Sequence, residues 1–320
     1  MRPHTKTTKS PYWALKQIEV GAIGVCCAKV GEAEVLVEGG VNDILITSEI
    51  VSVSKINRLA ALARHASIKV VVDNAENARQ ISEAVVSAQS EISVLVDVNI
   101  RINRCGVEPG EPTTTLAKIV DKLPALHFAG LNGYEGHVFG FGDERIPETL
   151  EALEKLQYAV SEVNAAGLPI ETVSAGGTST HDITCKVPEV TEVQAGSYIF
   201  MDGDYLSIMD DFAPALSLLA TVISRPTSDR AVLDTGMKSV SIDRGLPQVV
   251  DLPGAEFVKI SEEHGAMTVE GEAQRLRIGD KVSLRPMHGD TTINLHTHYF
   301  GVRGGRLDSV IEIAGRGRFR

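Results

Sequence analysis

The sequence predicts an α/β fold: a TIM-type (β/α)8 barrel whose first strand is largely missing, followed by a smaller all-β domain. Up to about residue 202, short apolar runs alternate with longer amphipathic segments, which is typical of parallel strands joined by helices. Later in the chain, short β-like runs are separated by Gly, Pro and Asp turns, at 218–225, 231–237, 256–265, 266–271 and 280–286. We therefore expect an α/β barrel at residues 1–211 and a β-domain at residues 212–320.

The barrel strands are expected at the short apolar runs. Seven runs fit, at 21–28, 43–50, 67–74, 91–99, 126–137, 168–177 and 192–202. Apolar residues recur at helical spacing between them, at 30–39, 52–65, 74–89 and 145–167. A barrel of this type needs eight strands. Residues 2–20 are typical of the end of a strand followed directly by a helix, so we expect the first strand to be abbreviated or its opening segment to be absent.

The composition favours a soluble protein that acts on small molecules. The 320 residues include 31 Lys and Arg and 42 Asp and Glu, which gives a formal net charge of −11. Because phosphate binding needs a basic footprint, this charge argues against nucleic acid as the main partner. The four cysteines form no CxxC pair, which fits reduced thiols, and no apolar stretch is long enough for a membrane span. We expect a cytoplasmic protein with neither a nucleic acid nor a membrane as partner.

Two glycine-containing loops are candidates for holding a phosphate group. In barrels of this type, the active site lies at the carboxyl ends of the strands, and the loops after strands seven and eight often hold phosphate. The motif SAGGTST (174–180) follows the seventh strand position, and AGSY (195–198) lies in the eighth. Glycines let backbone N–H groups converge on an anion. A Gly-Gly-Thr turn is often only a turn, so both interpretations stay open.

Polar residues follow several other strand ends. Lys6 lies among other cations in RPHTKTTKSP, which makes it a candidate for Schiff-base chemistry, although the local sequence by itself favours a basic surface turn. Asn103 with Arg104, residues 134–137 and Gln194 stand where packing would call for apolar residues. Each is explained equally well as an exposed residue, but their shared position at one face of the barrel indicates a site.

The β-domain contains a candidate metal pair. His288 and Asp290 are two residues apart, so we expect both side chains on one face of an extended segment. A ring nitrogen and a carboxylate in that relation can share a divalent cation. His296 and His298 have the same spacing. Matches of two residues are common by chance, so a structural role stays open for each pair.

Taken together, RPHTKTTKSP, GVCCAKVGEAEVL, NRCGV, GYEGH, SAGGTST, VQAGSYIFMD and PMHGDTTINLH resemble the motif series of the D-threonine aldolase and D-serine dehydratase family. The resemblance covers nearly the whole chain in collinear order. It implies an alanine-racemase-like barrel that binds pyridoxal 5′-phosphate (PLP), a β-domain that helps to build the active site, a divalent metal and a homodimer.

The resemblance also implies roles for individual residues. Lys6 matches the lysine that holds PLP covalently, and it is a candidate catalytic residue together with His137. Arg104 resembles the arginine near the phenolic oxygen of PLP, and Tyr134 the tyrosine beside its pyridine ring. Gln194 stands where alanine racemases carry an arginine near the pyridine nitrogen, so a neutral group would face that nitrogen.

Two further sets of residues are implied. The phosphate-holding loops correspond to Gly177, Thr178, Gly196 and Ser197, and the metal pair to His288 and Asp290. The chain departs from the pattern at two positions. Thr8 stands where many relatives carry a histidine, and Gly140 stands where aldolase-like relatives often carry another. These departures leave the identity of the general base open.

The implied function is that of a PLP- and divalent-metal-dependent lyase acting on β-hydroxy-D-amino acids. The cofactor would stabilise a carbanion at Cα, and the metal would act as a Lewis acid on the β-hydroxyl oxygen. Retro-aldol cleavage of a D-threonine-like substrate would then give glycine and an aldehyde. Asp290 favours this reaction, because dehydratase relatives commonly carry cysteine there. A carboxylate ligand also favours manganese or magnesium, with zinc as the alternative.

Other functions stay open at this point. A dehydratase acting on D-serine or 3-hydroxy-D-aspartate would use the same site to expel the β-hydroxyl group and give a 2-oxo acid and ammonia. An amino-acid racemase, or a PLP-binding protein without catalysis, would keep the barrel. The metal pair His288 and Asp290 speaks against both, because neither needs it.

Overall fold

Seven parallel strands form the sheet of the first unit, in the order in which they occur along the chain. In the computed structural model, which describes residues 1–140 and 142–320, each strand pairs in parallel with the next. The strands are β1 (Val25–Cys27), β2 (Asp43–Ile46), β3 (Ser67–Val72), β4 (Ile92–Val98), β5 (Leu126–Gly133), β6 (Thr172–Ala175) and β7 (Glu192–Val193). Every one lies inside a segment expected from the sequence, and the barrel-type α/β fold is confirmed.

Residues 2–5, which we call the N-terminal strand segment, take the place of the eighth strand. Their backbone pairs with β7 on one side and with β1 on the other, and His4 forms a parallel bridge with Cys26. Four backbone hydrogen bonds of 2.7–3.0 Å make this connection: Arg2 to Val193, His4 to Ala195, Cys26 to Pro3 and Thr5 to Cys26. The ring of strands is therefore closed by this segment.

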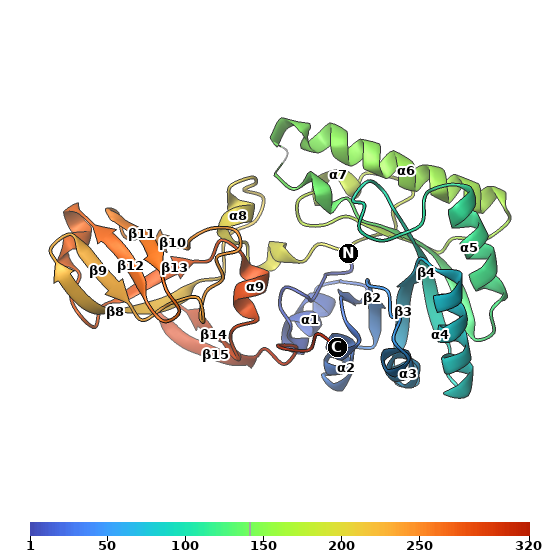
Figure 1. Cartoon of the computed structure of the whole chain (residues 1–320), viewed down its shortest axis with the longest axis horizontal. Coiled ribbons are helices and arrows are strands. Elements are labelled where there is room, and N and C mark those ends of the chain that lie inside the picture. Colours follow the sequence, from blue (N-terminus) through green and yellow to red (C-terminus); the bar gives the residue numbers. More distant parts are fainter. Residues whose placement is uncertain (141) are drawn as a thin grey trace. The chain divides into compact units, whose positions relative to one another are not determined.

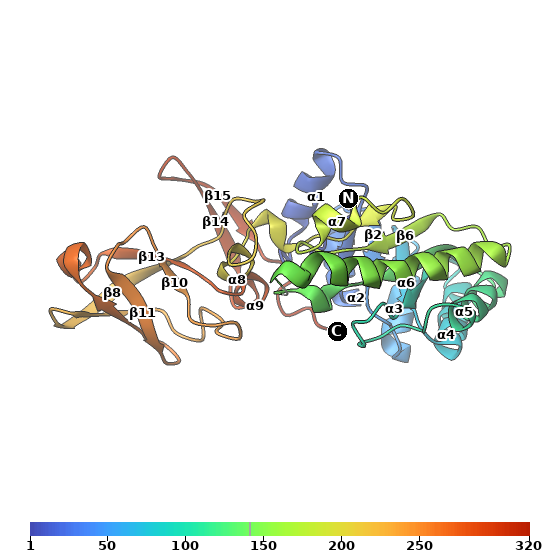
Figure 2. The same cartoon turned by 90° about the horizontal axis from the view of Figure 1, so that it is seen from above.

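Helices cover the outer side of the strands (Figures 1 and 2). They are α1 (Pro11–Glu19), α2 (Val30–Glu38), α3 (Val53–Leu62), α4 (Ala75–Ser87), α5 (Glu111–Lys122), α6 (Arg145–Ala165) and α7 (His181–Thr184). Two of them begin at side chains that cap the free backbone amides: Ser52 starts α3 and Asn74 starts α4. Proline at the first position of α1 needs no hydrogen-bonded amide there.

Side chains of the strands alternate between two apolar clusters. One large cluster contains residues that pack against the helices, such as Val70 and Val96. A second cluster takes one side chain from each of five consecutive strands: Cys26, Leu45, Val71, Leu95 and Ala129. Because successive side chains of a strand point to opposite faces, the second cluster fills the interior of the barrel. The barrel is therefore packed, and its site must lie at the strand ends.

The second unit is built from antiparallel strands. Its six-stranded sheet has the order β10-β13-β8-β9-β12-β11, and β14 pairs with β15 in a separate hairpin. The strands are β8 (Leu218–Thr227), β9 (Arg230–Leu233), β10 (Gln248–Val250), β11 (Ala255–Ile260), β12 (Gly265–Val269), β13 (Lys281–Arg285), β14 (His298–Arg303) and β15 (Arg306–Glu312). Two short helices, α8 (Gly203–Leu206) and α9 (Gly289–Ile293), accompany them. The expected all-β domain is confirmed.

The chain divides into two compact units. The first contains residues 1–196 and 317–320, and the second contains residues 197–316. The boundary expected after residue 211 lies between this division and β8, and it stays a prediction. The last residues return to the first unit, where the Arg320 carbonyl oxygen accepts a hydrogen bond of 3.0 Å from Arg58. Within the described ranges, every helix is too short or too polar to cross a membrane.

Candidate active site

Lys6 directly follows the N-terminal strand segment, at the carboxyl end of that strand. Its backbone amide donates to Nδ1 of His4 at 3.3 Å, and His4 Nε2 lies 2.9 Å from the Thr47 hydroxyl oxygen. Burial lowers the pKa of His4 well below its usual range, and the positive charges of Lys6, Lys9 and Arg104 add to this effect. The ring is therefore neutral. Since Nδ1 accepts, Nε2 carries the hydrogen and donates to Thr47.

Three of the expected site residues meet at Tyr134. The guanidinium carbon of Arg104 lies 5.4 Å from the centre of the Tyr134 ring, within the range of a cation–π contact. On another side, a Cβ atom placed on Gly177 would lie 3.2 Å from Cε2 of the same ring. The loop backbone comes this close because residue 177 has no side chain. Residues that follow β4, β5 and β6 are thus brought together.

The loop at Gly196 lies against the N-terminal strand segment. A Cβ atom on Gly196 would lie 2.8 Å from the His4 carbonyl oxygen and 2.9 Å from the hydroxyl oxygen of Thr7. That hydroxyl is buried and lacks a hydrogen-bond partner among the described residues. A close backbone approach beside a buried hydroxyl without a partner suits an anionic group. These features fit the phosphate of PLP, and Ser197 follows as the first residue of the second unit.

The Gly-Gly-Thr loop is held by the buried carboxylate of Glu135, which the sequence placed among the polar residues 134–137 without a role of its own. Glu135 is fully buried and accepts hydrogen bonds from the Gly176 amide at 3.2 Å, from Thr180 at 2.8 Å and from Thr184 at 2.5 Å. Burial raises the pKa of Glu135, while the hydrogen bonds from Thr184 and Thr180 oppose that shift. Thr178 is buried in the same loop. The position of Glu135 inside the GYEGH motif was the available signal.

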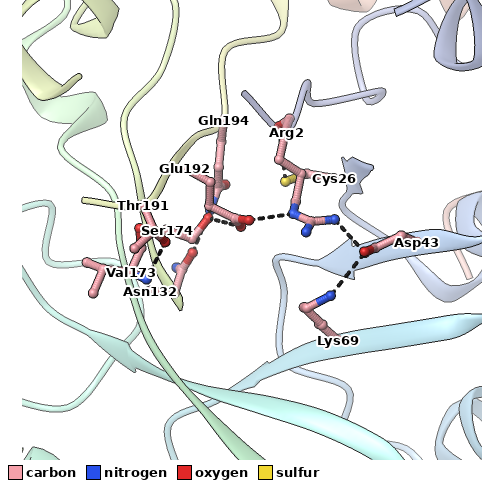
Figure 3. A network of polar contacts seen from close by, with 10 residues as sticks. All are labelled: Arg2, Cys26, Asp43, Lys69, Asn132, Val173, Ser174, Thr191, Glu192 and Gln194. Carbon is pink, nitrogen blue, oxygen red and sulfur yellow. Dashed lines mark hydrogen bonds and ion pairs between the residues drawn. The ribbon is translucent and has the colours of Figure 1, made fainter. Parts of the chain in front are cut away.

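Gln194 is part of a buried polar network (Figure 3). Its side-chain nitrogen donates to Asn132 Oδ1 and to Ser174 Oγ, at 2.7 Å each. Ser174 donates in turn to Glu192 at 2.7 Å, and Glu192 accepts from Arg2 at 2.8 Å. Gln194 is therefore held in place by hydrogen bonds that involve residues of β5, β6 and β7 and of the N-terminal strand segment.

Asp97 extends this network at its other end. Asn132 donates to Asp97 at 2.5 Å. Burial raises the pKa of Asp97 to about 7; the hydrogen bond from Asn132 and the charge of Arg104 act against the shift, and the charge of Glu49 adds to it. Close by along the strand ends, one ligand atom each of Glu49, Asp73 and Cys105 lies within 4.8 Å of the others. These three residues share no sequence motif, because each follows a different strand.

His137 lies in different surroundings. It lines a cavity of about 550 Å³ together with Arg101, Asn103, Glu148 and other charged or polar residues. Of the other candidate residues in the described part of the chain, Asn103 also lines this cavity, whereas Lys6, Tyr134 and Gln194 do not. Burial lowers the pKa of His137, and the positive charge of Arg101 adds to this effect. The ring is therefore neutral near pH 7, as a proton acceptor must be.

The expected metal pair lies at the start of α9. His288 precedes the helix and Asp290 is in its first turn, so the expected extended segment is wrong. The chain turns into a helix after Gly289, whose amide donates to the Asp202 carboxylate at 2.7 Å. The carboxylate oxygen Oδ1 of Asp290 is buried and has no hydrogen-bond partner among the described residues. A buried oxygen of this kind fits a cation.

The His288 ring is oriented by a residue that the sequence analysis missed. Its Nδ1 lies 2.6 Å from Oδ2 of Asp243, which leaves Nε2 as the nitrogen able to bind a metal. Asp243 also accepts hydrogen bonds from Ser241 at 2.6 Å and from Thr291 at 3.0 Å. Burial would raise the pKa of Asp243, but the hydrogen bonds from Ser241 and His288 lower it to about 2. Asp243 therefore stays ionised.

The second histidine pair is placed differently. His296 Nε2 lies 2.7 Å from the Ser239 carbonyl oxygen, so this ring donates to the backbone in a structural role. His298 begins β14, and its Nδ1 lies 3.1 Å from the Thr297 hydroxyl oxygen. Nε2 of His296 is therefore already engaged, whereas Oδ1 of Asp290 is buried and has no hydrogen-bond partner among the described residues. The pair His288 and Asp290 is the better metal candidate.

Comparisons with known proteins agree with both units. The family model for the alanine racemase N-terminal domain matches residues 2–204, and the model described as "Putative serine dehydratase domain" matches residues 215–302. The D-threonine aldolase of Arthrobacter sp. is 40% identical over 99% of this chain and 85% of its own length. The crystal structure of D-threonine aldolase from Filomicrobium marinum matches with a TM-score of 0.96 and 38% identity, over 99% of this chain and 87% of that one.

A dehydratase is also similar. The D-threo-3-hydroxyaspartate dehydratase of Delftia sp. HT23 matches with a TM-score of 0.86 and 26% identity, over 97% of this chain and 89% of that one. Both kinds of relative share the barrel and the second domain with this protein. The chain therefore belongs to the D-threonine aldolase and D-serine dehydratase-like family, whose first domain is of the alanine racemase type.

Proposed function

We propose that this protein is a PLP- and divalent-metal-dependent lyase that cleaves β-hydroxy-D-amino acids of the D-threonine type to glycine and an aldehyde. The observation that carries the proposal is the His288 and Asp290 pair, in which Asp290 has a buried oxygen without a hydrogen-bond partner among the described residues. A Lewis acid at the β-hydroxyl oxygen assists retro-aldol cleavage, whereas racemisation at Cα makes no use of one. The 40% identity to a D-threonine aldolase supports the same reaction.

The barrel residues would hold PLP, which when bound supplies an electron sink for a carbanion at Cα. Lys6 would bind it covalently, and Arg104 would approach its phenolic oxygen. Tyr134 would lie beside the pyridine ring, because Arg104 and the Gly177 backbone already hold the tyrosine ring in place. The phosphate would be held by Gly177, Thr178, Gly196 and Ser197, where the glycine backbones and the Thr7 hydroxyl leave suitable donors.

The residues of the second unit would hold the metal, which when bound supplies Lewis acidity. His288 would bind through Nε2, because Asp243 engages Nδ1. Asp290 would bind through its buried oxygen. We favour manganese or magnesium over zinc, because a carboxylate ligand is harder than the thiolate expected in the dehydratase.

Proton transfer needs a group that can accept and return a proton at the substrate. The amine Nζ of Lys6 is one such group, since a primary amine can act as a base once it is free. His137 is the second, because its lowered pKa keeps the ring neutral near pH 7. His137 would act from the cavity that it lines with Arg101 and Glu148.

The reaction is tested by product identification. Purified protein with PLP and manganese is given D-threonine, and acetaldehyde with glycine is the expected outcome. The products 2-oxobutanoate and ammonia would make the protein a dehydratase, and L-threonine or L-allo-threonine would make it a racemase. Bound PLP without turnover would favour a non-catalytic carrier.

The metal pair is tested in the same assay. Asp290→Asn should abolish metal-dependent turnover, whereas Asp229→Asn, at an exposed carboxylate in the same unit, should leave it unchanged. Asp290→Cys should shift the metal preference from manganese toward zinc. Full activity of the Asp290→Asn variant would overturn the assignment.

We propose in addition that the active protein is a cytoplasmic homodimer, as the family resemblance implies. Light scattering coupled to size-exclusion chromatography of the holoenzyme measures the mass. A mass of twice 34.3 kDa supports the dimer, and a mass of 34.3 kDa for the active species contradicts it.

A further inference from the structure

The orientation of the Gln194 amide is fixed by its neighbours. A glutamine amide has two N–H donors and one carbonyl acceptor. Both donors are used, one for Asn132 Oδ1 and one for Ser174 Oγ, at 2.7 Å each (Figure 3). Gln194, Asn132 and Ser174 are 8%, 5% and 0% exposed. Because water has little access to these partners, the amide cannot exchange them for solvent.

The Ser174 hydroxyl fixes the orientation from one side. Its single hydrogen is donated to Oε1 of Glu192, whose other carboxylate oxygen accepts from Arg2. Ser174 Oγ can therefore only accept from Gln194. Arg2 is held in turn by Asp43 at 2.6 Å, and Asp43 accepts from Lys69 at 3.0 Å. Three charged pairs thus keep the direction of this chain of hydrogen bonds.

Asn132 fixes the orientation from the other side. Its side-chain nitrogen donates to Asp97 Oδ1 at 2.5 Å, so its oxygen is turned toward Gln194 and accepts. This holds whether Asp97 is ionised or carries a proton on its other oxygen, since Oδ1 accepts in both cases. A reversed Gln194 amide would place its oxygen against two acceptors.

The remaining hydrogen-bonding group of Gln194 is its carbonyl oxygen. We propose that this oxygen accepts a hydrogen bond from the pyridine nitrogen of PLP and thereby keeps that nitrogen protonated. The inference rests on the proposed function and on the family resemblance, which implies that the pyridine nitrogen lies at Gln194. An arginine at this position would have donors alone and would favour the unprotonated nitrogen. A protonated ring withdraws electrons more strongly, which suits cleavage of a bond to Cα.

The test is a direct measurement of the protonation state. Holoenzyme is prepared with PLP labelled with ¹⁵N in the pyridine ring, and the ¹⁵N chemical shift is followed as a function of pH. We expect the wild type to show the protonated shift at neutral pH. Gln194→Met, which removes the acceptor at similar size, should lower the titration midpoint by about one pH unit or more. Gln194→Arg should show the unprotonated shift.

A matched control is Gln157→Met, because Gln157 in α6 donates to Glu189 at 2.8 Å and takes no part in the network. Its titration should equal that of the wild type. An unprotonated nitrogen in the wild type at neutral pH would overturn the inference, as would an unchanged midpoint in Gln194→Met. Either result, in a protein that binds PLP at Lys6 and cleaves D-threonine, leaves the proposed function intact. Failure to bind PLP would instead overturn both.

A second measurement does not depend on the variants being folded. Neutron diffraction from deuterated crystals of the wild-type holoenzyme locates the two deuterium atoms of the Gln194 amide. We expect one to point at Asn132 Oδ1 and the other at Ser174 Oγ. Deuterium on the side that faces PLP would show the opposite orientation and would contradict the proposal.

Discussion

The two sets of site residues are supported in opposite ways. In the barrel, Gln194 and Glu135 are buried; Gln194 donates both amide hydrogens to neighbouring strands, and Glu135 accepts hydrogen bonds from the Gly-Gly-Thr loop. In the second unit, His288 is held by the partly exposed Asp243, and Asp290 keeps a buried oxygen without a partner in the described structure. The side chains that position the barrel site are held by hydrogen bonds from the protein itself, whereas the buried oxygen of Asp290 would be satisfied by a bound cation. Metal binding should therefore stabilise the second unit, because it satisfies a group that is costly to leave alone.

The largest effect is expected at Lys6, which would bind PLP covalently and transfer protons at the substrate. Lys6→Ala should remove the visible absorption band of covalently bound PLP and lower kcat by about 10²- to 10⁴-fold. Lys16→Ala, at an exposed lysine of α1 paired with Glu19, is the control and should behave as the wild type. A persistent band in the Lys6→Ala protein would show that another residue binds the cofactor.

The second largest effect is expected at Glu135, in the barrel. Glu135→Ala would leave Thr180, Thr184 and the Gly176 amide without their shared acceptor. We expect the free energy of unfolding to fall by about 3 kcal/mol, measured by urea denaturation. The matched change Glu171→Ala, at an exposed glutamate, should cost less than about 0.5 kcal/mol. Equal losses in the two variants would mean that the buried carboxylate is not what holds this loop.

The next prediction concerns Asp243, which contacts the His288 ring and not the proposed metal. Asp243→Asn weakens the acceptor that fixes the ring, so manganese affinity should fall by about 10- to 100-fold. Titration calorimetry of the folded protein with manganese alone measures this. Asp229→Asn serves as control. If affinity is unchanged in Asp243→Asn, the ring does not depend on this carboxylate.

The smallest effect is the pH dependence of the barrel side. The folded pKa of Asp97, about 7, lies above its unfolded value, so the folded state binds the proton more tightly. Stability from this group is present at low pH and is lost as pH rises toward 7, by at most about 1.4 kcal/mol per pH unit. Urea denaturation between about pH 5 and about pH 8 should show this slope in the wild type. Asp97→Asn should flatten it, and an unchanged slope would place the titration elsewhere.

Much of the fold was predictable because it follows from local patterns. Strands such as β3 and β4 are rich in Val, Ile and Leu, which is typical of buried parallel strands. Their ends were less predictable. The segment expected as a strand at 192–202 forms a strand only over β7, because the chain then turns at Gly196 and enters a 3-10 turn at Ser197–Ile199.

The sequence by itself determined the type of fold, the family and the residues whose motifs carry them, among them Lys6, Tyr134 and His288. The tertiary structure alone decided what supports these residues. The roles of Glu135 and Asp243 were not predicted, because a carboxylate shows its role only through the donors around it, and these come from distant positions. The orientation of the Gln194 amide could not be predicted for the same physical reason. An amide has no preferred direction in the sequence, and it acquires one only when Asn132 and Ser174, from neighbouring strands, use both of its donors.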